Sequence, residues 1–215
     1  MTSPTDVAQF HAEYDIHPGD RVGLFGAVAD AVPTAARVLY PGSYVDITPS
    51  VWFDAVTYVD TDTRAARFFD CADAVVELVD SKRSAVGTPA GTATIEFHHL
   101  DYRTPLPFGD QAFDLLVSLY AGFISEHCTS HLRVGGTLLV NPSHGDAAMA
   151  SIDPRYELSG VVASGASGYR VRTDELDTYL IPKKEQTITV ESLHESGRGV
   201  GYTRSPFAYL FTRRH

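Results

Sequence analysis

The stretch RVLYPGSYVD at residues 37–46, together with VTYVD at residues 56–60, sets the pattern for the rest of the chain. It is typical of a buried strand, a turn with one glycine, a short helix and a second strand that ends in an acid. In a doubly wound α/β sheet, ligands bind outside the carboxyl ends of the strands, and an acid roughly 20 residues past the first turn suits a ribose. Gly42 and Asp60 therefore mark a candidate nucleotide site.

Short apolar segments alternate with amphipathic segments over the following hundred or so positions, which is typical of β-α-β units in a mostly parallel sheet. Beyond residue 141 the alternation loosens, and residues 165–204 form an insertion that is rich in polar and charged side chains. The predicted strands lie at residues 38–40, 56–60, 93–98, 113–120, 137–141, 156–164 and 206–213. The fold class is therefore α/β, with a doubly wound sheet.

Helix signals fill the spaces between these strands. Thr48 is expected to cap a short helix with Pro49 at its first position, and Asp62 is expected to cap the next helix. Apolar residues at helical spacing between Ala65 and Val79 predict one continuous helix there. Residues 123–132 predict a further helix that ends before the Gly-Gly pair at 135–136.

The N-terminal part of the chain alternates helix-like and turn-like pieces. Val7, Phe10 and Tyr14 fall at helical spacing, residues 17–20 break the pattern, and a second helical piece surrounds residues 22–32. Residues 1–35 either form a helical cap across the ligand face or merely cover an edge of the sheet. We expect a single domain, with the cap at 1–35, the ligand-binding core at 36–145 and the insertion at 165–204.

Composition excludes several classes of protein. The formal net charge of -10 disfavours nucleic acid as a partner, because an acidic surface repels phosphate backbones. Cys71 and Cys128 lack the spacing of a disulfide framework or a zinc site, which suits a reducing cytoplasm. The N-terminus has no signal-peptide pattern, and no apolar run approaches the roughly 20 residues of a membrane span. We expect a soluble, cytoplasmic protein with no membrane partner.

The segments DYRTPLPFGDQAFDLLV at 101–117 and LRVGGTLLV at 132–140 present an ordered set of features. An acid precedes a Leu-Pro-Phe segment, Phe-Asp opens a strand, and a Gly-Gly turn leads into the next strand. This order resembles that of class I S-adenosylmethionine-dependent methyltransferases, and FAYLF at 207–211 is a weaker match to that family's antiparallel last strand. The resemblance covers residues 36–145. It implies a seven-stranded, Rossmann-like sheet and S-adenosylmethionine as the cofactor.

The resemblance also implies a set of cofactor contacts. Asp60 would accept hydrogen bonds from the ribose hydroxyls, Asp101 would accept one from the adenine amino group, and Tyr102 would lie against the purine. The full set of expected cofactor-binding residues is Gly42, Ser43, Tyr44, Asp60, Asp101, Tyr102 and Ser118.

Other roles remain open for the acids near the strand ends. Asp60 and Asp101 are either ligand contacts or helix and turn caps, and Asp114 is expected to be a surface acid. Asp46 either faces the amino-acid part of the cofactor or closes the turn.

Acceptor contacts are expected from loops 118–123 and 141–146, which follow the fourth and fifth strands. Tyr120 and His144 are the side chains there that can orient or deprotonate a small-molecule acceptor. His98-His99, and the pair His127 and His131, lack a carboxylate or cysteine at ligand spacing, so no metal is expected. The acceptor itself and the oligomeric state have no signature in the sequence.

The turn after the first strand departs from the family pattern. Where the family has several glycines, Gly42 is followed by Ser43, Tyr44, Val45 and Asp46. Two functions follow: methyl transfer to a small molecule, or a methyltransferase-like binding module that has lost catalysis. A nicotinamide dehydrogenase is disfavoured because Gly-x-Gly-x-x-Gly is absent after the first strand.

Overall fold

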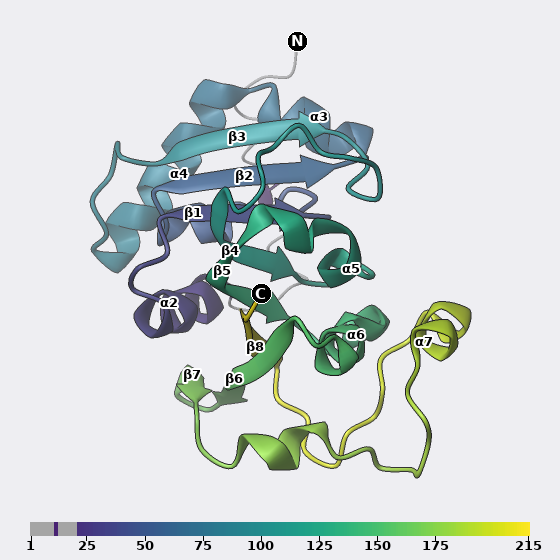
Figure 1. Cartoon of the computed structure of the whole chain (residues 1–215). Coiled ribbons are helices and arrows are strands. Elements are labelled where there is room, and N and C mark those ends of the chain that lie inside the picture. The colour runs from purple at the N-terminus through teal and green to yellow at the C-terminus, as the bar shows by residue number, and fades with distance from the viewer. Residues whose placement is uncertain (1–10, 13–20) are drawn as a thin grey trace.

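The strands form one mixed sheet of eight strands in the order β3-β2-β1-β4-β5-β8-β6-β7 (Figure 1). The structure is a computed structural model, and it describes residues 11–12 and 21–215. The parallel strands at the centre of the sheet and at its β3 edge are β1 (Arg37–Pro41), β2 (Ala55–Asp60), β3 (Thr94–His99), β4 (Phe113–Ser118) and β5 (Leu132–Val140). The order of these strands is that of a doubly wound Rossmann-type sheet, so the predicted fold class is confirmed.

Antiparallel strands complete the other side of the sheet. The C-terminal strand β8 (Ala208–Arg213) lies between β5 and β6 (Tyr156–Gly165) and is antiparallel to both. This confirms the expected antiparallel last strand. One further strand, β7 (Gly168–Arg172), pairs with β6 through a hairpin and was not predicted, because it lies in the polar segment that reads as an insertion.

Helices cover both faces of the sheet (Figure 1). Val38 and Tyr40 of β1 point into one core with the helices that precede β1 and follow β2, whereas Leu39 points into the other core, as strand alternation requires. The first core contains α2 (Arg21–Ala31), α3 (Thr63–Phe69) and α4 (Ala72–Val86); the second contains α5 (Ile124–Cys128) and α6 (Asp146–Ile152). The remaining elements are η1 (Thr48–Val51), η2 (Thr129–His131), η3 (Ser143–Gly145), η4 (Leu176–Leu180) and α7 (Val190–Ser196).

The helix predicted between residues 65 and 79 is two helices. Cys71 has φ −88° and ψ 54°, outside the helical region, and separates α3 from α4. Ala72 and Val76 of the predicted apolar stripe are exposed. The apolar residues therefore belong to two helices with different axes. They looked continuous because the apolar residues of both helices have the same spacing in the sequence. The expectation that Asp62 caps α3 is confirmed, because its side chain accepts a hydrogen bond from the Arg64 amide.

Two further sequence predictions are corrected. Thr48 does not cap η1; its hydroxyl donates to Asp46 instead, at 2.5 Å. The helix predicted at 123–132 is short, and the Gly-Gly pair lies inside β5 rather than before it. A Cβ on Gly136 would lie 2.7 Å from Leu132 Cδ1 and 2.8 Å from Arg133 O. Glycine is therefore required there by close packing at a bulge, where the register between β4 and β5 shifts.

Several residues near the N-terminus lie outside the described residues, including the predicted helix with Val7, Phe10 and Tyr14 and the turn at 17–20. The second helical piece is confirmed as α2. Asp114 does more than occupy the surface: its carboxylate accepts the amides of Ala36 and Arg37 at 3.0 and 2.9 Å and pairs with Arg133. None of the helices in residues 11–12 and 21–215 combines the length and apolar character of a membrane span.

Candidate functional site

The loops after β1, β3 and β4 meet at the carboxyl end of the sheet. Gly42 has φ +67°, and a Cβ there would lie 2.7 Å from the Ala121 Cβ and 3.8 Å from the Tyr102 ring. The Tyr102 hydroxyl donates to the Gly122 carbonyl at 3.0 Å. Glycine is therefore needed at 42 for both its left-handed backbone and its close approach to the β4 loop. Two of the predicted cofactor residues, Gly42 and Tyr102, are brought together here.

Asp60 lies at the end of β2 and is oriented by two backbone amides. Its Oδ2 accepts from Tyr44 N at 2.7 Å, and its Oδ1 accepts from Asp62 N at 2.8 Å. A carboxylate oxygen has two lone-pair sites, and the residue is only partly buried. Each oxygen can therefore accept one more hydrogen bond from a ligand hydroxyl. Asp62, in contrast, is committed to its helix cap and to the ion pair with Arg64.

The glycine-poor turn keeps a glycine-like backbone. Tyr44 has φ +49°, in the left-handed region that non-glycine residues rarely adopt. Ser43 and Val45 on either side are buried, and the guanidinium of Arg64 lies 5.2 Å from the centroid of the Tyr44 ring. The side chains therefore leave the turn toward the core and toward α3. Such a conformation costs on the order of 1–3 kcal/mol and persists only where the surroundings enforce it.

Asp46 closes the turn. It is fully buried, forms an ion pair with Arg21 at 2.5 Å, and accepts hydrogen bonds from the Thr48 amide at 3.1 Å and the Tyr40 hydroxyl at 3.2 Å. Of the two roles considered from the sequence, the structure supports closure of the turn. The buried ion pair also fixes the start of α2 beside the loop after β1.

Asp101 and Ser118 already have protein partners. Asp101 forms a two-point ion pair with Arg103, whose guanidinium holds the pKa of that carboxyl at about 2. Ser118 is fully buried, and its hydroxyl donates to Asp146. Asp101 remains partly exposed and can accept a further hydrogen bond, whereas the Ser118 side chain points into the protein. Their roles as cofactor contacts stay predictions.

A hydrogen-bonded chain links the two candidate acceptor-side residues. The Tyr120 amide and the Ser143 hydroxyl both bond Asn141 Oδ1, at 3.2 and 2.6 Å, and Ser143 Oγ lies 3.0 Å from His144 Nδ1. The backbone N–H of Tyr120 can only donate, so the Asn141 side chain presents its oxygen, Oδ1, to it. The Ser143 hydroxyl must use its single proton on the same oxygen. His144 Nδ1 must then donate to Ser143. The lone pair of a neutral His144 is therefore on Nε2.

Tyr120 and His144 sit on adjacent loops. Tyr120 has φ +59° and is 47% exposed, and the Arg21 guanidinium lies 5.0 Å from the centroid of its ring. His144 has φ +53° and is exposed. A Cβ on Gly122, in the loop after β4, would lie 4.0 Å from the His144 Cβ. The loops that carry these two left-handed residues thus approach each other at Gly122.

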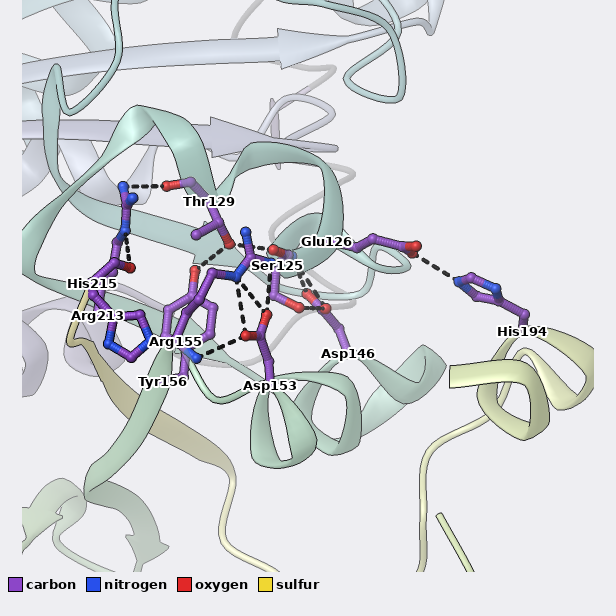
Figure 2. A network of polar contacts seen from close by, with 10 residues as sticks. All are labelled: Ser125, Glu126, Thr129, Asp146, Asp153, Arg155, Tyr156, His194, Arg213 and His215. Atoms are coloured by element: carbon purple, nitrogen blue, oxygen red, sulfur yellow. Dashed lines mark hydrogen bonds and ion pairs between the residues drawn. The ribbon is translucent and has the colours of Figure 1, made fainter. Parts of the chain in front are cut away.

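Asp146 lies beneath these loops, and Figure 2 shows its hydrogen bonds with Ser125. It is fully buried and accepts hydrogen bonds from the hydroxyls of Ser118 and Ser125 and from the Ser125 amide. Burial raises the pKa of this carboxyl, and the serine donors oppose the shift. Sequence reasoning placed Asp146 among acceptor contacts, but its side chain joins the end of β4 to the starts of α5 and α6.

The insertion is fastened to the same loops. His194 of α7 bonds Glu126 of α5 at 2.8 Å (Figure 2), and its ring lies edge-on to Phe123 with centroids 4.8 Å apart. A Cβ on Gly199 would lie 1.8 Å from the Pro142 carbonyl oxygen. Backbone contact therefore joins the segment after α7 to the loop that carries His144.

No protein-family model matches the chain, and a sequence comparison with curated proteins finds no match. Solved structures with a similar backbone include three with named activities. The [4+2]-cyclase SpnF is 20% identical with a TM-score of 0.39, covering 55% of this chain and 43% of that chain. The O-methyltransferase TomG from Streptomyces achromogenes, in complex with S-adenosylmethionine, is 17% identical with a TM-score of 0.43, covering 78% and 86%. An O-methyltransferase from Bacillus cereus, in complex with S-adenosylhomocysteine, is 13% identical with a TM-score of 0.48, covering 78% and 87%.

The fold assignment rests on the strand order of this chain rather than on these similarities. Strands β3, β2, β1, β4 and β5 follow the Rossmann-type order, and the last strand is antiparallel beside β5. This is the Rossmann-like arrangement of class I methyltransferases that the sequence motifs predicted. Fold alone does not define an activity.

Proposed function

We propose that this protein transfers a methyl group from S-adenosylmethionine to a small-molecule acceptor. The observation that carries the proposal is the Asp60 carboxylate at the end of β2, held by the Tyr44 and Asp62 amides with a free lone pair on each oxygen. Vicinal ribose hydroxyls match this arrangement, because two donors can bond the two oxygens of one carboxylate.

The chain's own residues would hold the cofactor as follows. The Gly42 turn would accept the methionine part by backbone approach, Asp60 the ribose, and Asp101 with Tyr102 the adenine. The left-handed backbone at Tyr44 supports this assignment, because the turn keeps its shape without the usual glycines. When bound, the cofactor supplies an electrophilic methyl group, and transfer then demands mainly alignment of the acceptor.

The acceptor side would be formed by the loops after β4 and β5. His144 would act as the general base through Nε2, because Ser143 and Asn141 direct the Nδ1 proton away from the acceptor. Tyr120 would stack on or orient the acceptor with its exposed ring. Arg21, at the start of α2, would border this face, because its guanidinium pairs with Asp46 and lies 5.0 Å from the centroid of the Tyr120 ring.

The test is calorimetric titration of the full-length protein with S-adenosylmethionine and S-adenosylhomocysteine, with adenosine as the control ligand. Saturable binding of both cofactor forms, tighter than that of adenosine, is the expected result. Absence of binding of either form at millimolar concentration would overturn the proposal. That outcome would favour the alternative, a methyltransferase-like binding module without catalysis.

A further inference from the structure

The part of the insertion that lies between β7 and β8 contains a pocket whose lining is basic. The pocket has a volume of about 390 Å³ and lies between the segment around residues 183–188, α7 and the segment 198–201. Lys183, Lys184 and Arg198 contribute to its wall, with hydroxyls and an amide from Thr187, Ser192, Ser196 and Gln186. A volume of this order suits a small molecule rather than a polymer.

The three basic side chains of this pocket have no acidic partner in the described part of the chain. Within the described residues, no carboxylate lies within ion-pair distance of Lys183, Lys184 or Arg198. Glu185, Glu191 and Glu195 are near in the sequence, yet none of them is part of the lining. The lining therefore carries net positive charge.

This pattern is unusual in this chain, whose formal net charge is -10. Elsewhere most arginines are paired: ion pairs join Arg21 to Asp46, Arg64 to Asp62, Arg83 to Asp54, Arg103 to Asp101, Arg133 to Asp114, Arg155 to Asp153, Arg172 to Asp174, Arg204 to Glu175 and Arg214 to Glu157. Uncompensated cations around a cavity in an acidic protein raise the local concentration of anions.

The pocket adjoins the loops of the acceptor side. Its wall residue Arg198 has its carbonyl oxygen 3.1 Å from the position of a Cβ on Gly145, directly after His144. Leu193, another wall residue, is buried in the core that includes α5 and α6. Figure 1 shows α7 beside α6, on the side toward which the parallel strands point. The pocket therefore lies in the segment of the insertion that is in contact with the loop after β5.

We propose that this pocket binds a small molecule through an anionic group, a phosphate or a carboxylate, held by Lys183, Lys184 and Arg198. Given the proposed function, on which this last step rests, the molecule is the methyl acceptor. Arg198 supplies planar, two-point hydrogen bonding and the lysines supply point charges.

The experiment titrates the full chain with pyrophosphate and with citrate, followed by calorimetry and by chemical-shift changes. The test variant combines Lys183→Gln, Lys184→Gln and Arg198→Gln. The matched control combines Arg37→Gln, Arg67→Gln and Arg170→Gln, which removes the same charge from exposed positions outside the pocket. Circular dichroism and thermal melting establish that both variants are folded.

The expected result is saturable binding of at least one probe, with shift changes confined to residues 183–201 and affinity at least tenfold weaker in the test variant alone. Preference for pyrophosphate indicates a phosphate-bearing ligand, and preference for citrate a carboxylate. Failure of both probes at millimolar concentration, or equal weakening in the control variant, overturns the proposal. Because S-adenosylmethionine binding is measured separately, anion binding without cofactor binding would overturn the proposed function and keep the anion site.

Discussion

Charged side chains in the loops after β1 to β3 have protein partners, whereas the basic side chains of segment 183–201 of the insertion have no partner among the described carboxylates. In the first region Asp60, at the end of β2, and Asp62, at the N-cap of α3, accept hydrogen bonds from backbone amides, and Asp62 and Asp101 are paired with nearby arginines. In segment 183–201, Lys183, Lys184 and Arg198 line a pocket, and no carboxylate of residues 11–12 and 21–215 forms an ion pair with them. The first region fixes its polar groups before a ligand arrives. The second keeps basic side chains whose charge the proposed anion would neutralise.

The largest expected effect is that of Asp60→Ala on S-adenosylmethionine binding. Loss of two charge-assisted hydrogen bonds, each worth roughly 1.5–3 kcal/mol, should weaken the affinity by about 100-fold or more. Asp62→Ala is the matched control, because Asp62 caps α3 and is committed to Arg64. Calorimetry should show pyrophosphate or citrate binding unchanged in both variants. Equal losses of cofactor affinity in the two variants would contradict the separate roles.

His144→Gln should slow methyl transfer by about 100-fold, as expected for loss of a general base, and leave cofactor affinity unchanged. The rate of S-adenosylhomocysteine formation with a mixture of anionic small molecules is the measurement. Long-range proton–nitrogen NMR of the wild type should find the proton of neutral His144 on Nδ1, and Ser143→Ala should remove that preference. A wild-type proton on Nε2 would contradict the hydrogen-bonded chain.

Gln186→Glu tests the role of positive charge in the pocket of the insertion. Gln186 lines the pocket and is exposed, so the new carboxylate should neutralise part of its charge without a change of shape. Anion affinity should fall by about tenfold, which corresponds to about 1.4 kcal/mol. Cofactor affinity should not change. Unaltered anion binding would show that the lining charge is not what holds the anion.

The turn after β1 can be tested by a pair of variants at Tyr44. Both Tyr44→Gly and Tyr44→Ala remove the ring and its contact with Arg64, so their difference reports the backbone alone. Because φ is +49° there, the glycine variant should be more stable than the alanine variant by about 1 kcal/mol. Urea unfolding measures the difference. Equal stabilities would indicate that the left-handed conformation is not retained.

The smallest expected effect concerns the Asp101–Arg103 pair, whose members are partly and largely exposed. Arg103 lowers the pKa of Asp101 from 3.8 to about 2. The pair therefore stabilises the folded state above the unfolded pKa, and this contribution is lost as the pH falls through the folded value. The difference in unfolding free energy between wild type and Asp101→Asn should be constant near neutral pH and vanish near pH 2. A difference that persists at low pH would contradict an ionic origin.

The sequence was sufficient for the central strands because their pattern is local. Val38 to Tyr40 and Val56 to Asp60 are apolar runs bounded by turn residues, and each matches an observed strand within one or two positions. The break at Cys71 could not be seen, because apolar residues on both sides keep helical spacing although they belong to two axes. The early start of β5 includes a bulge at which Gly136 packs closely against Leu132, and residue spacing in the sequence does not express that contact.

In the candidate site, too, the features that follow from a local sequence pattern were predicted and those that depend on contacts between loops were not. Gly42 and Tyr102 were predicted and meet in the structure, because both follow strands whose ends share one edge of the sheet. The series of hydrogen bonds from Asn141 through Ser143 to His144 was not predicted, because it depends on a bond from the Tyr120 amide to a different loop. The basic pocket was missed because Lys184 and Arg198 are brought around one cavity only by α7.

The close contact between Gly199 and the Pro142 carbonyl has a consequence for how specificity can change. The insertion meets the β5 loop through main-chain atoms at a position that tolerates no side chain. Under the proposed anion binding, substitutions in the pocket wall at residues 183–192 would alter which ligand is held and leave the contact between Gly199 and Pro142 in place. The contact at Gly199 fixes the segment after α7 against the β5 loop, whereas the residues that line the pocket are free to vary.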